Sequence, residues 1–304
     1  MTGALTLIGN VNVDLILGPV TPWPTPGTEL IVADQDLRFG GSTGNSALTA
    51  IALGGEVRVI ANIGCDAMGR WLADHMPEQA KRWRRSEQPT AISVGLGHPE
   101  GERTFITALG HLADFSLADV MQQLPSSAMR GEIALLSGVF VTPRLAADYA
   151  SLLQTLRHRG FTIALDTGWP NGGWSAQTRE QLLGWCGLVD YALFNEVEVV
   201  SLAPGKALTE AARHVRQSLH SGGTLVVKRG GDGASLVSPT QEVAISAPKV
   251  PVIDTIGAGD VFNAAFLLAV QTGKEPVEAL QAAVACASRA VSTRPRQFIR
   301  PQAA

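Results

Sequence analysis

Hydrophobic and polar positions follow two different patterns along this chain, and the pattern changes near residue 113. Before it, short β-rich runs broken by turns predict strands at residues 5–9, 11–17, 29–33, 37–39, 57–63, 91–96 and 103–108. The last two strands are joined by a Gly-His-Pro-Glu-Gly segment and are expected to form a hairpin. Helical spacing predicts one helix that begins after Ser42 and Thr43, either of which can cap it, and another at residues 68–76.

The second part of the chain alternates strands and helices more strictly. It predicts helices at residues 117–124, 144–158, 210–219, 258–272 and 276–293, and strands at 133–137, 162–166, 191–194 and 224–228. Continuous apolar strands between amphipathic helices indicate a mostly parallel sheet with helices on both faces. The expected fold class is therefore α/β, with three layers. The early strands form a small separate sheet, a lid built from segments about 11–39 and 90–110 within a single domain, 1–304.

The charge balance excludes several classes of partner. The formal net charge is -3, which supplies no overall field to hold nucleic acid or an anionic membrane. No apolar run approaches the roughly 20 residues that cross a bilayer. Cys65, Cys186 and Cys286 are widely separated and form no C-x-x-C pair, which is typical of a reducing compartment. We expect a cytoplasmic protein that binds neither nucleic acid nor a membrane.

The strongest chemical signal lies at the start of the helix at residues 258–272. Three small residues, Gly257, Ala258 and Gly259, leave backbone N–H groups exposed at the positive end of a helix dipole, which suits a phosphoryl group in transit. Asp260 follows within the first turn, where a carboxylate can accept a hydroxyl proton and align the attacking oxygen. The alternative is that Asp260 only complements the helix dipole. The Gly-Ala-Gly approach, with Asp254 ahead of it, favours the catalytic interpretation.

Two upstream segments have polar residues suited to a small ligand. Asp14 follows a short strand and can accept hydrogen bonds from neighbouring hydroxyls, with Asn12 on the same face. Asp14 could equally be a turn residue. Gly40 and Gly41 permit close approach of backbone to ligand, and Asn45 lies on the first turn of the following helix, facing the same space.

Six motifs in order resemble those of one family. Asp-Thr-Ile-Gly-Ala-Gly-Asp at residues 254–260 resembles the C-terminal signature of the ribokinase (PfkB) family of carbohydrate kinases. Residues 40–47 resemble its N-terminal signature, Gly-Gly-x-x-x-Asn-x-Ala. Residues 9–14, 64–69, 195–198 and 228–233 resemble its sugar-binding, Gly-x-Asp-x-x-Gly, Asn-x-x-Glu and nucleotide-loop elements. The run Thr-Arg-Pro-Arg-Gln at residues 293–297 departs from the family's Thr-Arg-x-Gly-Ala.

The resemblance implies a ribokinase-like fold and assigns further roles. It implies ATP and Mg²⁺, with Glu198 organising the metal through water, and a homodimer formed through the lid. It also raises a monovalent-cation site, for K⁺, at Asp254. Arg103 would reach the substrate from the lid, although a solvent-facing arginine is about as consistent with its position. The residues that it assigns to the nucleotide are Asn195, Lys228, Gly230, Gly233 and Thr255.

The expected function is transfer of the γ-phosphate of ATP to a primary hydroxyl of a small carbohydrate. A nucleoside kinase of the same family is one alternative, which an aromatic stack over the base would distinguish. A non-catalytic sugar- or nucleotide-binding regulator is another. A phosphorylated sugar is disfavoured as the acceptor, because the sequence shows no cluster of Lys and Arg near the predicted sugar end.

Overall fold

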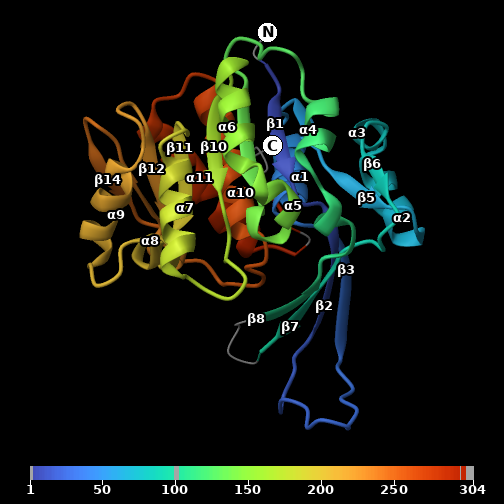
Figure 1. Cartoon of the computed structure of the whole chain (residues 1–304). Helices are drawn as coiled ribbons and strands as arrows, with labels where there is room; N and C mark the ends of the chain where they lie inside the picture. Colours follow the sequence, from blue (N-terminus) through green and yellow to red (C-terminus); the bar gives the residue numbers. More distant parts are fainter. Residues whose placement is uncertain (1–2, 99–102, 295, 299–304) are drawn as a thin grey trace, which may run out of the picture.

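An eight-stranded sheet forms the centre of the molecule (Figure 1). The structure, a computed structural model, describes residues 3–98, 103–294 and 296–298. Six strands are parallel, and two at one edge are antiparallel. In spatial order the strands are β14 (Glu242–Ile245), β13 (Ala234–Val237), β12 (Thr224–Lys228), β11 (Tyr191–Asn195), β10 (Thr162–Asp166), β9 (Ile133–Ser137), β1 (Leu5–Gly9) and β4 (Val57–Ile60).

Helices cover both faces of this sheet, because successive strand residues point to opposite sides. In β1, Leu5 and Leu7 pack into one core and Ile8 packs into the other. The first core is closed by α1 (Ser42–Ala52), α2 (Ala67–His75), α10 (Ala258–Gln271) and α11 (Pro276–Val291). The second is closed by α4 (Leu117–Gln123), α5 (Pro143–Ala147), α6 (Tyr149–His158), α7 (Ala176–Cys186), α8 (Glu196–Leu202) and α9 (Leu208–Gln217). The predicted three-layer α/β fold is confirmed.

A separate four-stranded sheet projects from the main body (Figure 1). Its order is β3 (Asp34–Gly40), β2 (Asn12–Gly18), β7 (Ile92–Gly97) and β8 (Arg103–Ala108). The register pairs Asp14 with Arg38 and Leu15 with Leu37, so polar and apolar residues occupy opposite faces. The predicted small sheet is therefore present, with its polar face turned toward the carboxyl edge of the main sheet.

Several predicted boundaries are wrong. Residues 29–33 form no strand, and one strand, β3, begins only at Asp34. Residues 57–63 divide into β4 and β5 (Asn62–Gly64), and β5 pairs with β6 (Arg84–Ser86) in a sheet of its own. The helix at 144–158 is two helices that meet at Asp148. Helix α7 and strand β14 were not predicted, and α3 (Pro77–Ala80) was not either.

The remaining sequence expectations concern membranes and cysteines. Within the described ranges, no helix combines the length and apolar character needed to cross a membrane. All three cysteines are free, and only Cys65 is exposed.

Candidate active site

The site lies at the carboxyl edge of the main sheet, where strand order reverses. The chain runs outward from β1 to β4 and then crosses back to β9 on the other side of β1. In open α/β sheets, the crevice outside such a reversal is where ligands bind. Register aligns Gly9, Ser137 and Asp166 along this edge, and pairs Asn195 with Lys228 beside them. Polar side chains from β10 and β12 therefore converge at the crevice.

Helix α10 begins in this crevice with a glycine as its N-cap. Gly257 has φ 69°, and a Cβ there would lie 2.8 Å from Asn45 Nδ2, so a glycine is required on both counts. No side chain caps the helix. Of the three N–H groups predicted to bind an anion, that of Ala258 donates to the Thr255 carbonyl oxygen at 3.1 Å. The anion site therefore depends on Gly257 and Gly259 more than on Ala258.

The Asp260 carboxyl group is held at the start of α10 by α1. Asn45 Nδ2 donates to Asp260 Oδ2 at 2.9 Å, and Ser46 Oγ donates to the Asp260 carbonyl oxygen at 3.2 Å. Burial, together with the negative charge of Asp166, raises the pKa of Asp260 to about 7. A carboxyl group with a pKa near 7 can both take and release a proton at neutral pH, which is what a general base requires.

Asn12 and Asp14 lie side by side on the polar face of the lid. Asn12 Nδ2 donates to Asp14 Oδ1 at 2.7 Å, and Asn10 Nδ2 donates to Asn12 Oδ1 at 3.0 Å. Both predicted residues are buried. A Cβ on Gly40 would stand 2.1 Å from Asp14 Oδ2, so the lid strand approaches this carboxyl group through a glycine. Burial raises the pKa of Asp14 to about 6, against the opposing effect of the Asn12 hydrogen bond.

A cavity of about 670 Å³ opens beside Asp14 and Asn45. We call it the lid-side cavity. Its other lining residues come from the lid, from α1 and α2, from the segment before α10 and from the segment after α11: Gln35, Asp36, Arg38, Phe39, Leu48, Thr49, His75, Ile256, Arg294, Arg296 and Phe298. Because Asn45 lines this cavity and is bonded to Asp260, the cavity adjoins the candidate base.

Four arginines gather around Asp254 and this cavity, which corrects the expectation that the sugar end lacks basic residues. Asp254 pairs with Arg38 at 2.5 Å, with Arg103 at 3.4 Å and with Arg296 at 3.4 Å. Arg294 lies 3.9 Å from Asp36. We call these four residues the arginine cluster. The cluster could not be identified from the sequence, because its members come from β3, β8 and the segment after α11.

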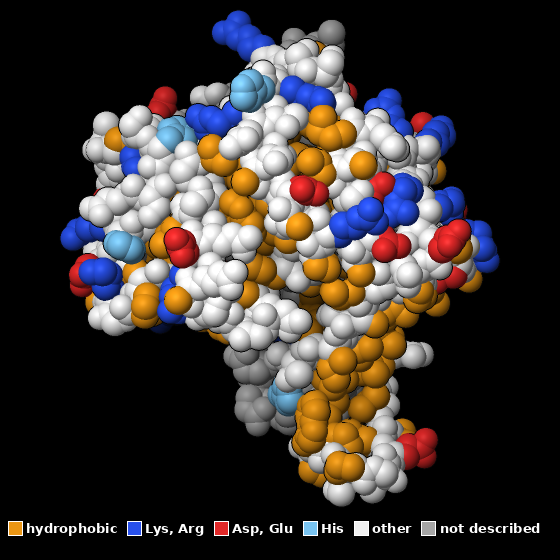
Figure 2. Space-filling model, in the orientation of Figure 1, with side chains coloured by type: hydrophobic (Ala, Val, Ile, Leu, Met, Phe, Trp, Pro, Cys, Tyr) orange, Lys and Arg blue, Asp and Glu red, His pale blue; other side chains and the backbone are white. Residues whose placement is uncertain are grey.

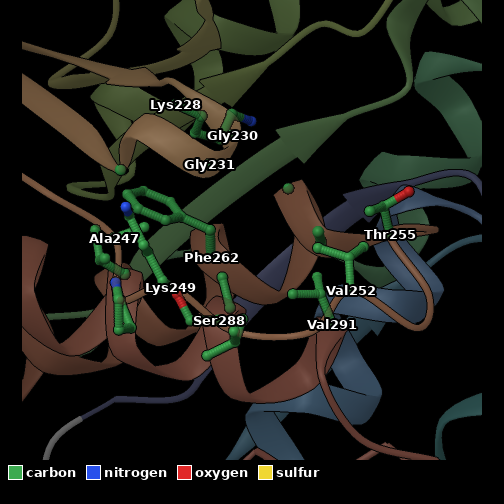
Figure 3. Close-up of a pocket in the computed structure, with 17 residues that line it drawn as sticks. Lys228, Gly230, Gly231, Ala247, Lys249, Val252, Thr255, Phe262, Ser288 and Val291 are labelled. Carbon is green, nitrogen blue, oxygen red and sulfur yellow. The ribbon is translucent and has the colours of Figure 1, made fainter. Parts of the chain in front are cut away.

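A second cavity, of about 410 Å³, lies between β12, α10 and α11, and we call it the α10–α11 cavity (Figure 3). Phe262 of α10 and Ser288 and Val291 of α11 line one side, with Lys228 and Gly230 beyond them (Figure 3). Among the predicted nucleotide residues, it brings together Lys228, Gly230, Gly233 and Thr255, and Ala258 and Gly259 also line it. Asn195 is not among its lining residues.

Lys228 belongs to a buried polar network that sequence reasoning missed. Lys228 Nζ donates to Asp166 Oδ2 at 2.7 Å and to Asn263 Oδ1 at 3.2 Å, and Asn263 Nδ2 also donates to Asp166. Although burial alone would lower the pKa of Lys228, the charges of Asp166 and Glu198 raise it overall. Two signals could have identified this network. Asp166 ends a parallel strand, and Asn263 lies three residues after Asp260 on one helix face.

Asn195 and Glu198 form a reciprocal cap at the start of α8. Glu198 N donates to Asn195 Oδ1 at 2.8 Å, and Asn195 N donates to Glu198 Oε2 at 2.7 Å. Burial, with the nearby charge of Asp166, raises the pKa of Glu198 to about 7. Asp166 is close enough for its charge to act on Glu198. Carboxylate oxygens are ligands that Mg²⁺ prefers, and this ion binds few protein ligands and keeps its waters. In the described ranges no group of three or more His, Cys, Asp or Glu could hold a metal.

Arg103 joins the lid to Thr255, which lines the α10–α11 cavity. Arg103 Nη1 donates to Thr255 Oγ1 at 2.7 Å, and Arg103 also pairs with Asp254. The carboxyl group of Asp254, predicted as a monovalent-cation site, is thus surrounded by guanidinium groups, which disfavour a further cation at its side chain.

Comparison with known proteins places this geometry in a family. A model of the pfkB family of carbohydrate kinases matches residues 4–302. The ribokinase of Haemophilus influenzae is 24% identical over 307 residues, which cover 98% of this chain and 95% of that protein. An Arabidopsis thaliana ribokinase structure with ribose and ATP has a TM-score of 0.74 at 22% identity and covers 97% of this chain and 94% of its own.

An Escherichia coli structure in complex with ATP and Mg²⁺ has a TM-score of 0.79 at 20% identity, over 96% of this chain and 94% of that chain. At such identities the structural likeness establishes the ribokinase-like fold. The family match over nearly the whole chain establishes more: this protein is a carbohydrate kinase of the pfkB family.

Proposed function

We propose that the protein transfers the γ-phosphoryl group of ATP to a hydroxyl, most simply a primary one, of a small carbohydrate bound beneath the lid. The observation that carries this proposal is the position of Asp260. It begins a helix whose neighbouring residues Ala258 and Gly259 line the α10–α11 cavity, and it is bonded to Asn45, which lines the lid-side cavity. A base between two cavities can accept the proton of a hydroxyl in one while that oxygen attacks a phosphorus presented from the other.

The α10–α11 cavity suits the nucleotide. Its apolar walls can hold the base, and Lys228 and the N–H groups of Gly257 and Gly259 lie where the phosphates would enter the crevice. Gly230 and Gly233 let the backbone pass beside the nucleotide. Magnesium bound near Glu198 and Asp166 would neutralise charge on the phosphates. Lys228 and the start of α10 would stabilise the charge that develops during transfer.

The substrate would bind through Asn12, Asp14, Gly41 and Asn45, with Arg103 closing over it from the lid. Asp14 is buried and bonded to Asn12, which leaves it ready to accept hydrogen bonds from substrate hydroxyls. In this arrangement Asn45 orients Asp260 through its amide.

ADP release in the presence of Mg-ATP tests the proposal, using pentoses, hexoses, sugar acids, sugar phosphates and nucleosides as acceptors. We expect turnover on one class, and a loss of about 10³-fold or more in kcat for Asp260→Asn with substrate binding kept. Asp148→Asn, an exposed substitution at the α5–α6 junction, is the matched control and should retain wild-type kcat. Equal activity in Asp260→Asn and wild type would overturn the assignment of the base.

A nucleoside acceptor is the second candidate. Phe105 of β8 pairs with Gly95 on the same lid face as Asp14 and is 48% exposed, so it could stack on a base. Trp169 and Trp174 contact each other but do not line the lid-side cavity. Turnover of nucleosides above free sugars would favour this reading. A non-catalytic regulator would bind ligand with no ADP released by wild type.

The opposite face of the lid suits a second copy of the chain. Leu15, Leu37, Val94 and Ile106 share that face by register, and Figure 2 shows hydrophobic side chains running along the lid. We propose a homodimer through this apolar face. Sedimentation equilibrium should show a dimer for wild type and a monomer for Leu37→Glu, because a charge on the apolar face opposes its burial. Residence in the cytoplasm and dependence on K⁺ stay predictions.

A further inference from the structure

The arginines that line the lid-side cavity share their carboxylate partners. Asp36 pairs with Arg38 and Arg294, and Asp254 pairs with Arg38 and Arg296. Asp254 also contacts Arg103. Burial raises the pKa of Asp254, but the hydrogen bond from the Ile256 N–H and the charges of Arg38 and Arg296 outweigh it and leave the pKa lowered, so this carboxyl group is ionised. Arg294 lies 3.9 Å from Asp36 and is 68% exposed, so its charge is only weakly matched.

The cluster faces the substrate side of the molecule. Arg38, Arg294 and Arg296 line the lid-side cavity together with Asp14 and Asn45. A smaller cavity next to it is lined by Arg38, Arg103 and Arg294. Three guanidinium groups are therefore presented, beside the carboxyl groups of Asp14 and Asp36, to the space where the acceptor would bind. The nucleotide phosphates would approach from the other side of α10.

A purely structural role accounts for only part of this arrangement. One arginine bound to Asp254 would suffice to join the lid to the main body, since Arg38 already does so at 2.5 Å. Crowding further guanidinium groups against it carries a cost: burial, and the like charges of Arg38 and Arg103, lower the pKa of Arg296 despite Asp254. Arg296 Nη2 also donates to the Ile256 carbonyl oxygen at 2.5 Å, which holds it in place. An additional anion in the cavity would relieve this repulsion.

We propose that the natural acceptor is an anionic carbohydrate, a polyol that carries a carboxylate or phosphate group, with that group bound by Arg38, Arg294 and Arg296. The position of the attacking hydroxyl beside Asp260 rests on the proposed function, whereas binding of the anion does not. Planar guanidinium groups bind carboxylate and phosphate oxygens in pairs and remain charged when partly buried. A neutral sugar offers these guanidinium groups no anionic oxygen.

Paired ligands test this proposal directly. Thermal shifts without nucleotide would be measured with ribose against ribose 5-phosphate, fructose against fructose 6-phosphate and glucose against gluconate and 6-phosphogluconate. ADP release would then be measured for the same pairs. We expect the anionic member of at least one pair to bind about tenfold more tightly or more, with a KM that rises with ionic strength. The sugar acids and the sugar phosphates separate the two sources of negative charge.

Two arginine variants and a control assign the effect to the cluster. Arg296→Gln and the more exposed Arg294→Gln should each raise the KM and weaken the thermal shift for the anionic ligand, about tenfold or more for Arg296→Gln. Arg213→Gln, which removes a surface arginine paired with Glu242, should change neither. Because Arg294 is exposed, its variant tests the cluster even if Arg296→Gln does not fold.

The outcomes separate the two proposals. A neutral sugar preferred over its anionic counterparts, or an anion effect that persists in both variants, would overturn the anionic acceptor while leaving the kinase mechanism intact. The absence of a thermal shift with every anionic ligand would count against it equally. Arginine-dependent binding of an anionic ligand with no ADP released would keep this inference and reject the catalytic proposal.

Discussion

The two cavities on either side of α10 differ in the elements and the kinds of residue that line them. The α10–α11 cavity is formed by the sheet edge, by two helices and by the segment between β14 and α10, and its walls are mostly apolar side chains with glycine backbone at Gly230 and Gly233. The lid-side cavity is formed by the lid, by α1 and α2 and by the segment after α11, and it carries charged side chains on several sides. The first depends on backbone and shape, and the second depends on individual side chains.

This difference suggests which kind of ligand each cavity binds. A surface made by core elements is fixed by packing that the whole fold needs, so it suits the ligand that all members of a family share. A surface made by the lid and a terminal segment can change its side chains at little cost to stability, so it suits the ligand that differs between relatives. Substitutions on the two sides should therefore differ in which kinetic parameter they change.

Among the substitutions that separate the two cavities, Lys228→Met on the nucleotide side is expected to have the largest effect. The loss of this ammonium group leaves Asp166 buried without its cation, which should cost about 3–5 kcal/mol of stability. We expect kcat/KM for ATP to fall by about 10²- to 10³-fold as well, because a charge aimed at the phosphates is lost. Steady-state kinetics and thermal unfolding measure the two effects.

Lys206→Met is the control, since Lys206 pairs with Glu210 on the surface. It should leave both quantities close to wild type. If Lys228→Met acted mainly on the KM of the acceptor, the proposed division between the two cavities would fail.

A smaller effect, confined to the substrate side, is expected from Gly40→Ala. The added Cβ would stand 2.1 Å from Asp14 Oδ2 and must displace that carboxyl group. We expect the KM of the acceptor to rise by about 10- to 100-fold while the KM of ATP stays within about twofold. Gly184→Ala, in α7 with no atom within 4 Å of its added Cβ, is the matched control and should be neutral or slightly stabilising. If the KM values of the acceptor and of ATP rose by the same factor, the proposed division between the two cavities would be contradicted.

The smallest effect is the pH dependence of stability that Asp260, between the two sides, contributes. Its pKa is raised from 3.8 to about 7 in the folded protein, so between these values the folded state binds more protons than the unfolded state does. The contribution of Asp260 to stability therefore falls as pH rises through this window. Asp260→Asn removes the penalty and should unfold a few degrees above wild type at pH 8, with a smaller difference at pH 5. In wild type, kcat/KM should rise with pH through about 7, because the base must be ionised.

Melting curves of both proteins from pH 5 to pH 8 measure the stability effect. A difference in melting temperature that does not change with pH would show that Asp260 titrates near its ordinary range. In that case the raised pKa could not explain its action as a base.

The sequence predicted the parts of the molecule that depend on local pattern. The parallel strands from Ile133 onward have continuous apolar runs, and the glycines before α1 and α10 occur in distinctive order, so both could be identified. Helix α7 was not predicted because its apolar residues do not gather on one face, although Ser175 caps it. The break at Asp148 was missed because the apolar spacing continues across it.

Contacts between residues far apart in the chain leave no such pattern in the sequence. Arg38, Arg103 and Arg296 are separated by most of the chain, and each alone resembles an ordinary surface arginine until the fold places them around one carboxylate. The same holds for Lys228, Asp166 and Asn263, which come from two strands and a helix. Local motifs therefore indicated the chemistry of the site, whereas the arginine cluster could be identified only from the tertiary structure.

Most side chains that line the α10–α11 cavity are apolar, among them Val252, Phe262, Val284 and Val291. Apolar walls bind a flat purine ring through its size and shape and make no hydrogen bonds with its donors and acceptors. Discrimination between purine nucleotides should therefore be modest. We expect GTP and ITP to replace ATP with losses of about 10- to 100-fold rather than complete rejection. In a cell, the flux through this step would then follow the pool of purine triphosphates as a whole, and the supply of acceptor would be the variable that controls it.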